Sequence, residues 1–236
     1  MDRKLKQALD GAFRAPAPAG KAAFLKRHRR RELGHRELMA IQAGYIRRWV
    51  WGASLALFGL ILWAASRAGE QGLWCAAAAT PFLALLAVTE NGRSRLYRMA
   101  ELELACRMAR QSVLMARMVV LGLFHLALLA GLTPALAVWG AVGAARAGAY
   151  LLTPYLLTAA LGMELTRRIR GRECLTACGG GAALVSAAGF LLANRQSMPY
   201  RREDLPLWIG ALAAAAAAAA VEIKLNWKET EEVQWS

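Results

Sequence analysis

The sequence predicts an all-α, polytopic integral membrane protein with six transmembrane helices, and two observations support this fold class. Apolar residues make up 57% of the 236 residues and charged residues 19%, whereas soluble domains contain about half and about a quarter, respectively. The apolar residues also stand in long uninterrupted stretches that approach the roughly 20 residues needed to cross a bilayer. The hydrophobicity excludes a disordered chain, and four scattered cysteines exclude a disulfide-stapled secreted domain.

The apolar stretches divide the chain into six predicted spans. In chain order they are 49–66, 73–89, 112–132, 134–163, 175–193 and 207–226. The fourth stretch is too long for one ordinary span. It is either a single helix kinked at Pro154 or a short outer or re-entrant segment over 134–145 followed by a span. The predicted transmembrane domain therefore covers 47–226 and is followed by a cytoplasmic tail, 227–236.

The basic residues lie mostly on one side of the predicted spans. If both termini are cytoplasmic, 25 of the 30 Lys and Arg residues fall on the inner side, four fall outside, and Arg146 falls within the fourth stretch. Because basic residues accumulate in cytoplasmic loops, this split predicts cytoplasmic N- and C-termini in a multi-pass protein of a bacterial cytoplasmic membrane. Basic residues held near anionic membrane lipid account for most of the net charge of +14. The charge therefore does not indicate a nucleic-acid partner.

The segment 1–46 is predicted to be cytoplasmic and to carry amphipathic helices. It contains no apolar core of its own, so the first span is expected to act as an uncleaved anchor. Residues 2–13 have apolar side chains at helical spacing. They form either a helix that docks on a partner or a marginal helix that frays or rests on the membrane surface. Residues 31–48 combine apolar and basic residues before the first span, which predicts an amphipathic helix in the inner interface.

The connection 90–111 between the second and third spans is longer than a tight turn requires and contains no proline. Its apolar residues recur at helical spacing, and Glu103 and Arg107 stand four residues apart in the order that favours pairing. These features predict a cytoplasmic helical insert that transmits force or enters a partner's groove. The alternative is a solvated extension of the neighbouring spans.

This layout resembles that of the ABC-2-type permeases, the membrane subunits of a class of ABC transporters. Glu90-Asn91-Gly92 is similar to the family's Glu-x-Gly element after the second span, Leu102 and Leu104 fall in the short helix that follows, and Arg117 opens the third span. The resemblance implies that residues 93–111 form a coupling helix on a cytoplasmic ATP-binding-cassette subunit, within a homo- or hetero-oligomer. The partner-binding residues it implies are Arg93, Leu96, Tyr97, Arg98, Glu101, Leu102, Glu103 and Arg107.

A second hypothesis for the function follows from the long basic N-terminal segment. The chain would be a membrane-embedded regulator or scaffold that tethers a cytoplasmic partner through residues 1–46. Deletion of residues 1–20 separates the two hypotheses, because a regulator would lose its partner and a permease would keep its ATPase.

The sequence contains no pattern typical of a catalytic, cofactor or metal site. The glycine cluster 179–181 is not followed by the Lys-Ser/Thr pair of a phosphate-binding loop, so an ATPase would have to be a separate chain. Cys174 and Cys178 have no convergent histidines, which argues against zinc. The protein is therefore predicted not to be an enzyme and to need no cofactor.

Three ionisable residues within the apolar stretches are the remaining candidates for a functional role. His125 lies midway along the third stretch, Arg146 midway along the fourth, and Glu164 closes the fourth. Ionisable groups inside a membrane are costly and usually face a protein interior or water. Arg146 either forms part of a polar path or an interhelical lock, with His125 or a carbonyl as its partner, or lies near the outer headgroups if 134–145 is a separate segment.

Overall fold

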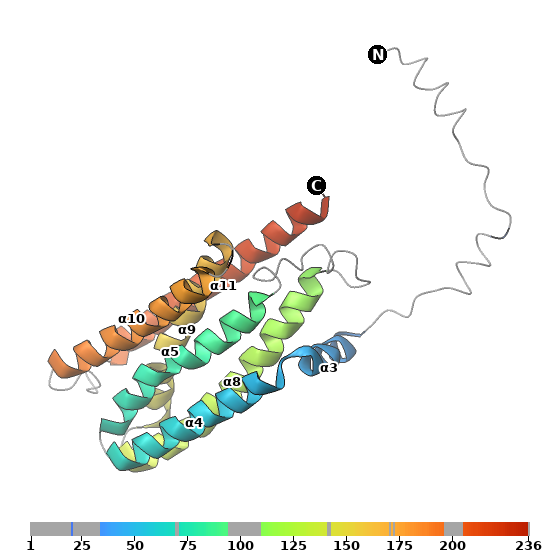
Figure 1. The fold of residues 1–236 in the computed structure, drawn as a ribbon. Helices are drawn as coiled ribbons and strands as arrows, with labels where there is room; N and C mark the ends of the chain where they lie inside the picture. Colours follow the sequence, from blue (N-terminus) through green and yellow to red (C-terminus); the bar gives the residue numbers. More distant parts are fainter. Residues whose placement is uncertain are drawn as a thin grey trace. The chain divides into compact units, whose positions relative to one another are not determined.

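The computed structural model describes the chain over residues 20, 34–68, 71–93, 110–140, 143–169, 171, 173–195 and 205–235. All regular elements in these ranges are helices, which confirms the all-α class. In chain order they are α3 His35–Tyr45, α4 Arg48–Ala68, α5 Gly72–Asn91, α8 Arg110–Gly140, α9 Ala144–Arg168, α10 Glu173–Arg195 and α11 Leu205–Trp235 (Figure 1). The chain divides into two units, 1–34 and 35–236, and these helices belong to the second unit.

Five of the described helices are long and apolar enough to cross a bilayer: α4, α5, α8, α10 and α11. They indicate a multi-pass membrane protein and correspond to five of the six predicted spans. The remaining long helix, α9, is not among them. Its 25 residues carry Arg146 in the first turn and Arg167 and Arg168 in the last.

The fourth predicted span has different boundaries in the structure. Helix α8 continues through Pro134 to Gly140, and α9 begins at Ala144. Residues 134–140 are therefore the end of the preceding helix. They are neither the start of one long kinked helix nor a separate re-entrant segment. Both sequence-based interpretations of 134–163 were wrong in taking Pro134 as a helix break, whereas the separate helix that begins near residue 145 agrees with the second interpretation.

Two prolines are accommodated inside helices by the threonine that precedes them. A proline has no N–H, so it leaves the carbonyl four residues earlier without its helical donor. The Thr80 hydroxyl donates to the Ala77 carbonyl at 2.9 Å, just before Pro81. The Thr133 hydroxyl donates to the Ala130 carbonyl at 2.8 Å, just before Pro134. Each carbonyl is the one that its proline leaves unpaired, so α5 and α8 continue without an unsatisfied group in an apolar environment.

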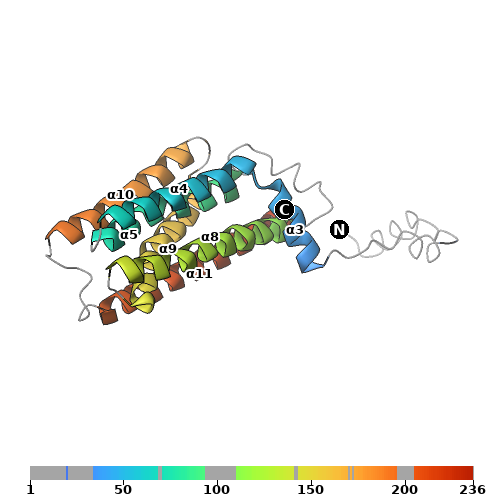
Figure 2. The same ribbon diagram turned by 90° about the horizontal axis from the view of Figure 1, so that it is seen from below.

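Helices α5 and α9 form the centre of the bundle. α9 packs against α5, α8, α10 and α11, and α5 packs against α4, α8, α9 and α10 (Figure 1 and Figure 2). The two helices approach closely at Gly162, where an added Cβ would lie 2.8 Å from a methyl group of Val88. Small residues at such crossings allow helices to pack tightly in membranes.

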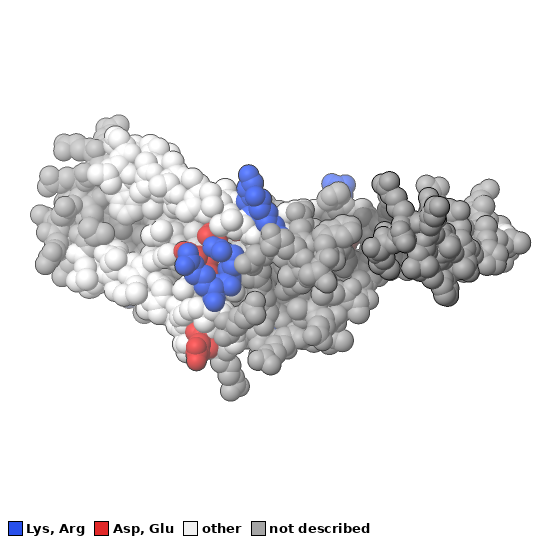
Figure 3. Space-filling view, turned by 90° about the horizontal axis from the view of Figure 1, so that it is seen from above, with Lys and Arg blue, Asp and Glu red and all other residues white. Residues whose placement is uncertain are grey.

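Short connections make consecutive helices run in alternating directions. Only a few residues separate α4 from α5, α8 from α9 and α9 from α10, and short connections join antiparallel neighbours. We call one end of the bundle the basic end: it contains the starts of α4, α8 and α10 and the ends of α5, α9 and α11. On the face in Figure 3, the described charged side chains lie close together beside an uncharged surface. This separation is typical of a protein whose uncharged part lies in lipid.

We predict that Thr80→Val destabilises the bundle, since the buried Ala77 carbonyl would lose the donor that the Thr80 hydroxyl supplies. The free energy of unfolding in detergent should fall by about 1–3 kcal/mol, the cost of an unsatisfied buried group.

Thr89→Val is the matched control for Thr80→Val. The Thr89 hydroxyl also donates to a carbonyl of α5, that of Leu86 at 3.1 Å, but no proline removes the ordinary helical donor to that carbonyl. Its loss should cost less than half as much. Equal losses for the two variants would refute the role given to the Thr80 hydroxyl.

Candidate functional site

A buried carboxylate joins three segments at the basic end. Glu90 is the penultimate residue of α5 and is only 4% exposed. Its Oε1 accepts hydrogen bonds from the Arg93 guanidinium at 3.2 Å and from the backbone N–H of Arg47 at 3.5 Å. A buried charge is tolerated when it is paired and hydrogen-bonded. Glu90 therefore ties the start of α4, and the beginning of the connection after α5, to the end of α5.

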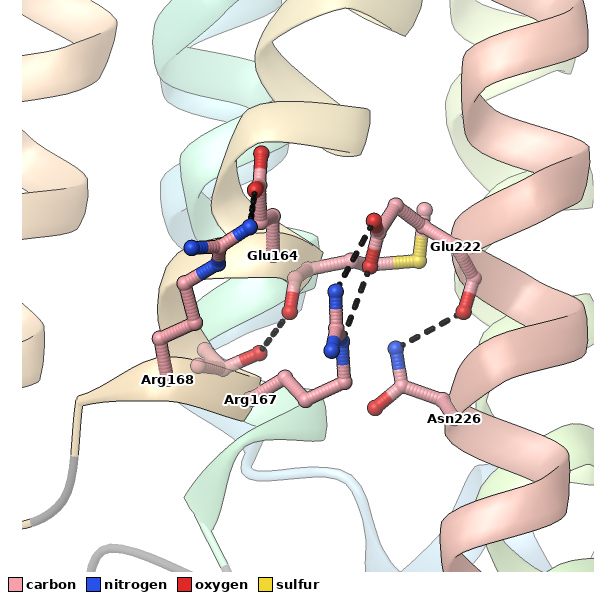
Figure 4. A network of polar contacts seen from close by, with 7 residues as sticks. Glu164, Arg167, Arg168, Glu222 and Asn226 are labelled. Carbon is pink, nitrogen blue, oxygen red and sulfur yellow. Dashed lines mark hydrogen bonds and ion pairs between the residues drawn. The ribbon is translucent and has the colours of Figure 1, made fainter.

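A second ion pair joins α9 to α11. Arg167 donates from Nε to Oε2 and from Nη2 to Oε1 of Glu222, both at 3.3 Å (Figure 4). The Arg167 and Glu222 side chains are 20% and 12% exposed. The neighbouring pair of Arg168 with Glu164, at 2.7 Å, has a 67% exposed arginine, and exposed pairs contribute little to stability. Arg168 and Glu164 both belong to α9, whereas the two-pronged Arg167–Glu222 pair links α9 to α11.

A chain of hydrogen bonds crosses the bundle at His125. Ser54 of α4 and His125 of α8 are fully buried. The Ser54 Oγ lies 3.0 Å from His125 Nε2, and the Tyr155 hydroxyl of α9 lies 3.2 Å from His125 Nδ1. In a neutral imidazole one nitrogen donates and the other accepts. The protons of this chain can therefore be ordered from serine to tyrosine or from tyrosine to serine.

An apolar cavity of about 290 Å³ lies between α5, α8, α9 and α11. Its walls are mostly aliphatic and methionine side chains. Polar side chains line it at two places: Tyr155 of the His125 chain, and a group at the basic end made of Asn91, Thr166 and Asn226. The Asn91 Oδ1 is buried and has no hydrogen-bond partner. The cavity thus extends from the buried hydrogen-bond chain to the basic end.

The residues assigned to the coupling helix fall almost entirely outside the described part of the chain. Arg93 is described, and it pairs with Glu90. The other seven lie outside the described residues: Leu96, Tyr97, Arg98, Glu101, Leu102, Glu103 and Arg107. Their role as a partner surface stays a prediction.

The three ionisable residues of the apolar stretches occupy different environments. His125 is buried in the hydrogen-bond chain, with Ser54 and Tyr155 as its partners. Arg146 is in the first turn of α9, far from the middle of a helix. Glu164 is in the last two turns of α9 and pairs with Arg168. The structure therefore brings none of the three together.

The partners of His125 and Arg167 are the residues that sequence reasoning missed. Ser54 and Tyr155 stand in different apolar stretches, and nothing in their spacing indicates that they meet. Glu222 left a signal, since it is a carboxylate near the inner end of the last predicted span, opposite a run of arginines after the fourth. The orientation of a membrane protein is predicted by counting Lys and Arg, and acidic residues are given little weight. The pair of Arg167 with Glu222 was therefore not predicted.

The two neighbouring thiols of α10 lie against each other, and one of them contacts α9. Cys174 and Cys178 place their sulfurs 4.0 Å apart, and Cys178 also contacts the Gly162 carbonyl at 3.8 Å. Within the described ranges, no three His, Cys, Asp or Glu side chains lie close enough to hold a metal ion.

Comparisons with known proteins give no relative for this chain. No family model, no curated protein and no solved structure matches it. Any function must therefore be argued from the chain itself.

We predict that Tyr155→Phe destabilises the bundle by about 1–3 kcal/mol, because it leaves a buried imidazole nitrogen without a partner. The effect should fall sharply when His125 is replaced by leucine in the same chain, since the partner that needs the hydroxyl is then absent. The measurement is detergent unfolding of the two single variants and the double variant. Tyr45→Phe, at a 70% exposed tyrosine, is the control, and additive losses in the cycle would contradict the coupling.

Proposed function

We propose that the chain is the membrane subunit of an ABC-type transporter and works with a separate cytoplasmic ATPase. It crosses the bacterial cytoplasmic membrane six times, with α9 as the sixth membrane-crossing helix and both termini in the cytoplasm. The basic end then faces the cytoplasm, and α3 lies at the inner interface. The residues 93–111 form the coupling helix that contacts the ATPase.

The burial of α9 supports its assignment as a span. Its 25 residues would extend over about 37 Å, which exceeds the roughly 30 Å of a hydrocarbon core. The hydroxyls of Thr153 and Thr158 are buried and donate to carbonyls one turn earlier, those of Ala149 and Pro154, at 2.8 Å. A helix surrounded by others, with its polar groups satisfied, does not need the apolar composition of a lipid-facing span.

The observation that carries the proposal is the position of Glu90. It is buried at the point where α5 passes into the 94–109 connection, and it bonds both Arg93 and the backbone of Arg47. A displacement of the connection would therefore reach α4 and α5 through a single side chain. Such a joint is what a subunit needs if it is to convert motion at a cytoplasmic partner into tilting of its membrane helices.

The transport cycle follows from this connection. ATP binding closes the ATPase subunits on each other and moves the coupling helix that rests on them. The movement is passed through Glu90 to α4 and α5, and through α5 to the central helix α9, which packs against it. The fixed pair of Arg167 and Glu222 makes α11 follow α9.

We predict opposite membrane sides for Gly143 and Gly171, the residues that flank α9. In a background without the four native cysteines, Gly143→Cys should react with a membrane-impermeant maleimide added to intact cells. Gly171→Cys and Ser94→Cys should react only after the membrane is opened. If Gly143→Cys and Gly171→Cys react from the same side, α9 does not cross the bilayer and the six-span topology fails.

We also predict that Leu102→Asp abolishes co-purification of an ATP-hydrolysing subunit in mild detergent, because a charge would replace an apolar contact of the coupling helix. Leu5→Asp, the same change in the N-terminal segment, and deletion of residues 1–20 should leave the subunit bound. Mass spectrometry of the purified complex and its ATPase activity are the two readouts.

The same experiment tests the rival function. If the deletion of residues 1–20 releases the bound protein and Leu102→Asp does not, the chain is a regulator that tethers its partner through the N-terminal segment. Glu90→Ala examines the joint itself: the ATPase should stay bound, while transport-linked hydrolysis falls. Loss of binding in Glu90→Ala would assign Glu90 to the partner surface instead.

A further inference from the structure

The cavity between α5, α8, α9 and α11 has the properties of a binding site for an apolar ligand. Its wall includes Val88, Met118 and Met163, and its volume of about 290 Å³ is at the lower limit of the roughly 300–1,000 Å³ typical of small-molecule sites. Water is held in cavities that offer it two to four polar partners. Along most of this wall such partners are absent, so the main part of the cavity suits a hydrocarbon chain.

The polar groups at the basic end indicate what the ligand carries at its other end. Asn91, Thr166 and Asn226 line the cavity there, and the Asn91 Oδ1 is a buried acceptor without a donor. Asn91 lines the cavity, so a rotation that brings its Oδ1 to the cavity wall would let a ligand hydroxyl supply that donor. Unsatisfied buried acceptors are costly, so a ligand with a hydroxyl at this level would be favoured over a plain hydrocarbon.

The charges beside this end favour an anion. Gly92, Thr166 and Trp227 line the cavity, and each is followed directly by a basic residue, in turn Arg93, Arg167 and Lys228. Arg93 and Arg167 are paired with Glu90 and Glu222 and Lys228 is exposed, so these five side chains carry a net charge of +1 at the basic end. Basic groups at a membrane surface attract anionic headgroups.

We propose that the cavity binds one acyl chain of an anionic glycerophospholipid from the leaflet at the basic end. The acyl chain occupies the apolar wall toward Tyr155. The phosphate lies by the basic residues that follow the lining positions, and a headgroup hydroxyl donates to Asn91. This site depends only on the basic end lying at a bilayer surface and not on the ATPase, so it stands or falls separately from the proposed function.

The chain offers a matched pair of variants for the test. Gly122 lines the cavity and Gly59 lies exposed on α4, and a Cβ added at either position meets no atom within 4 Å. Gly122→Leu therefore places a side chain into the cavity without a clash, whereas Gly59→Leu adds the same side chain to the outside. Both changes give a similar gain in helix propensity.

The experiment is photocrosslinking of the full chain in nanodiscs of phosphatidylcholine doped with phosphatidylglycerol that carries a diazirine on one acyl chain. We expect the wild type and Gly59→Leu to be labelled at α8 and α9 residues of the cavity. Labelling there should fall about tenfold in Gly122→Leu, equivalent to about 1.4 kcal/mol of lost binding. Equal labelling in Gly122→Leu and Gly59→Leu would overturn the site.

Two further labelling experiments test the headgroup of the proposed lipid. Phosphatidylcholine with the same diazirine chain should label the cavity several-fold less, and equal labelling would overturn the anionic headgroup. Asn91→Leu should reduce the preference for phosphatidylglycerol, and an unchanged preference would overturn the Asn91 contact. If Gly122→Leu does not give a monodisperse protein, Met115→Trp fills the same cavity from α8 and must show the same loss.

Discussion

In hydrocarbon, each polar group must find its partner within the protein, because lipid offers no donor or acceptor. The described helices meet this constraint at its most difficult points. Thr80 and Thr133 supply donors to carbonyls that a neighbouring proline leaves without one. Ser54 and Tyr155 satisfy both ring nitrogens of the buried His125. The contacts of His125 thereby join α4, α8 and α9 through polar groups that would have no substitute in lipid.

The same constraint sorts the helices by position. In α5, half of the apolar window is buried, whereas in α10 and α11 only 11% is buried. The outer helices thus present apolar side chains outward, and the most polar of the long helices, α9, has its hydroxyls inside the bundle. Composition and position are linked because the threonines and tyrosines of α9 cost little where neighbouring helices surround them.

The sequence predicted the helical class, and it predicted the bounds of the first two apolar helices within a few residues. It also predicted that charge gathers at one end. These features depend on composition and on the length of each apolar stretch. It failed at Pro134, where the Thr133 hydroxyl donates to the carbonyl that the proline leaves unpaired and the helix continues. It selected His125 on the rarity of a buried ionisable group but could not identify Ser54 or Tyr155, which come from other helices. Such partners depend on how helices are packed, and one sequence does not encode that in any local spacing.

The Arg167–Glu222 pair has a mechanical consequence for the last helix. Because both carboxylate oxygens accept hydrogen bonds from the Arg167 guanidinium, the pair opposes sliding of α9 along α11 at this level. Helix α11 continues for 13 residues beyond Glu222, about 20 Å. A rotation of a few degrees about this fulcrum therefore displaces the far tip of α11 by more than an ångström. The C-terminal arm amplifies small movements of the bundle.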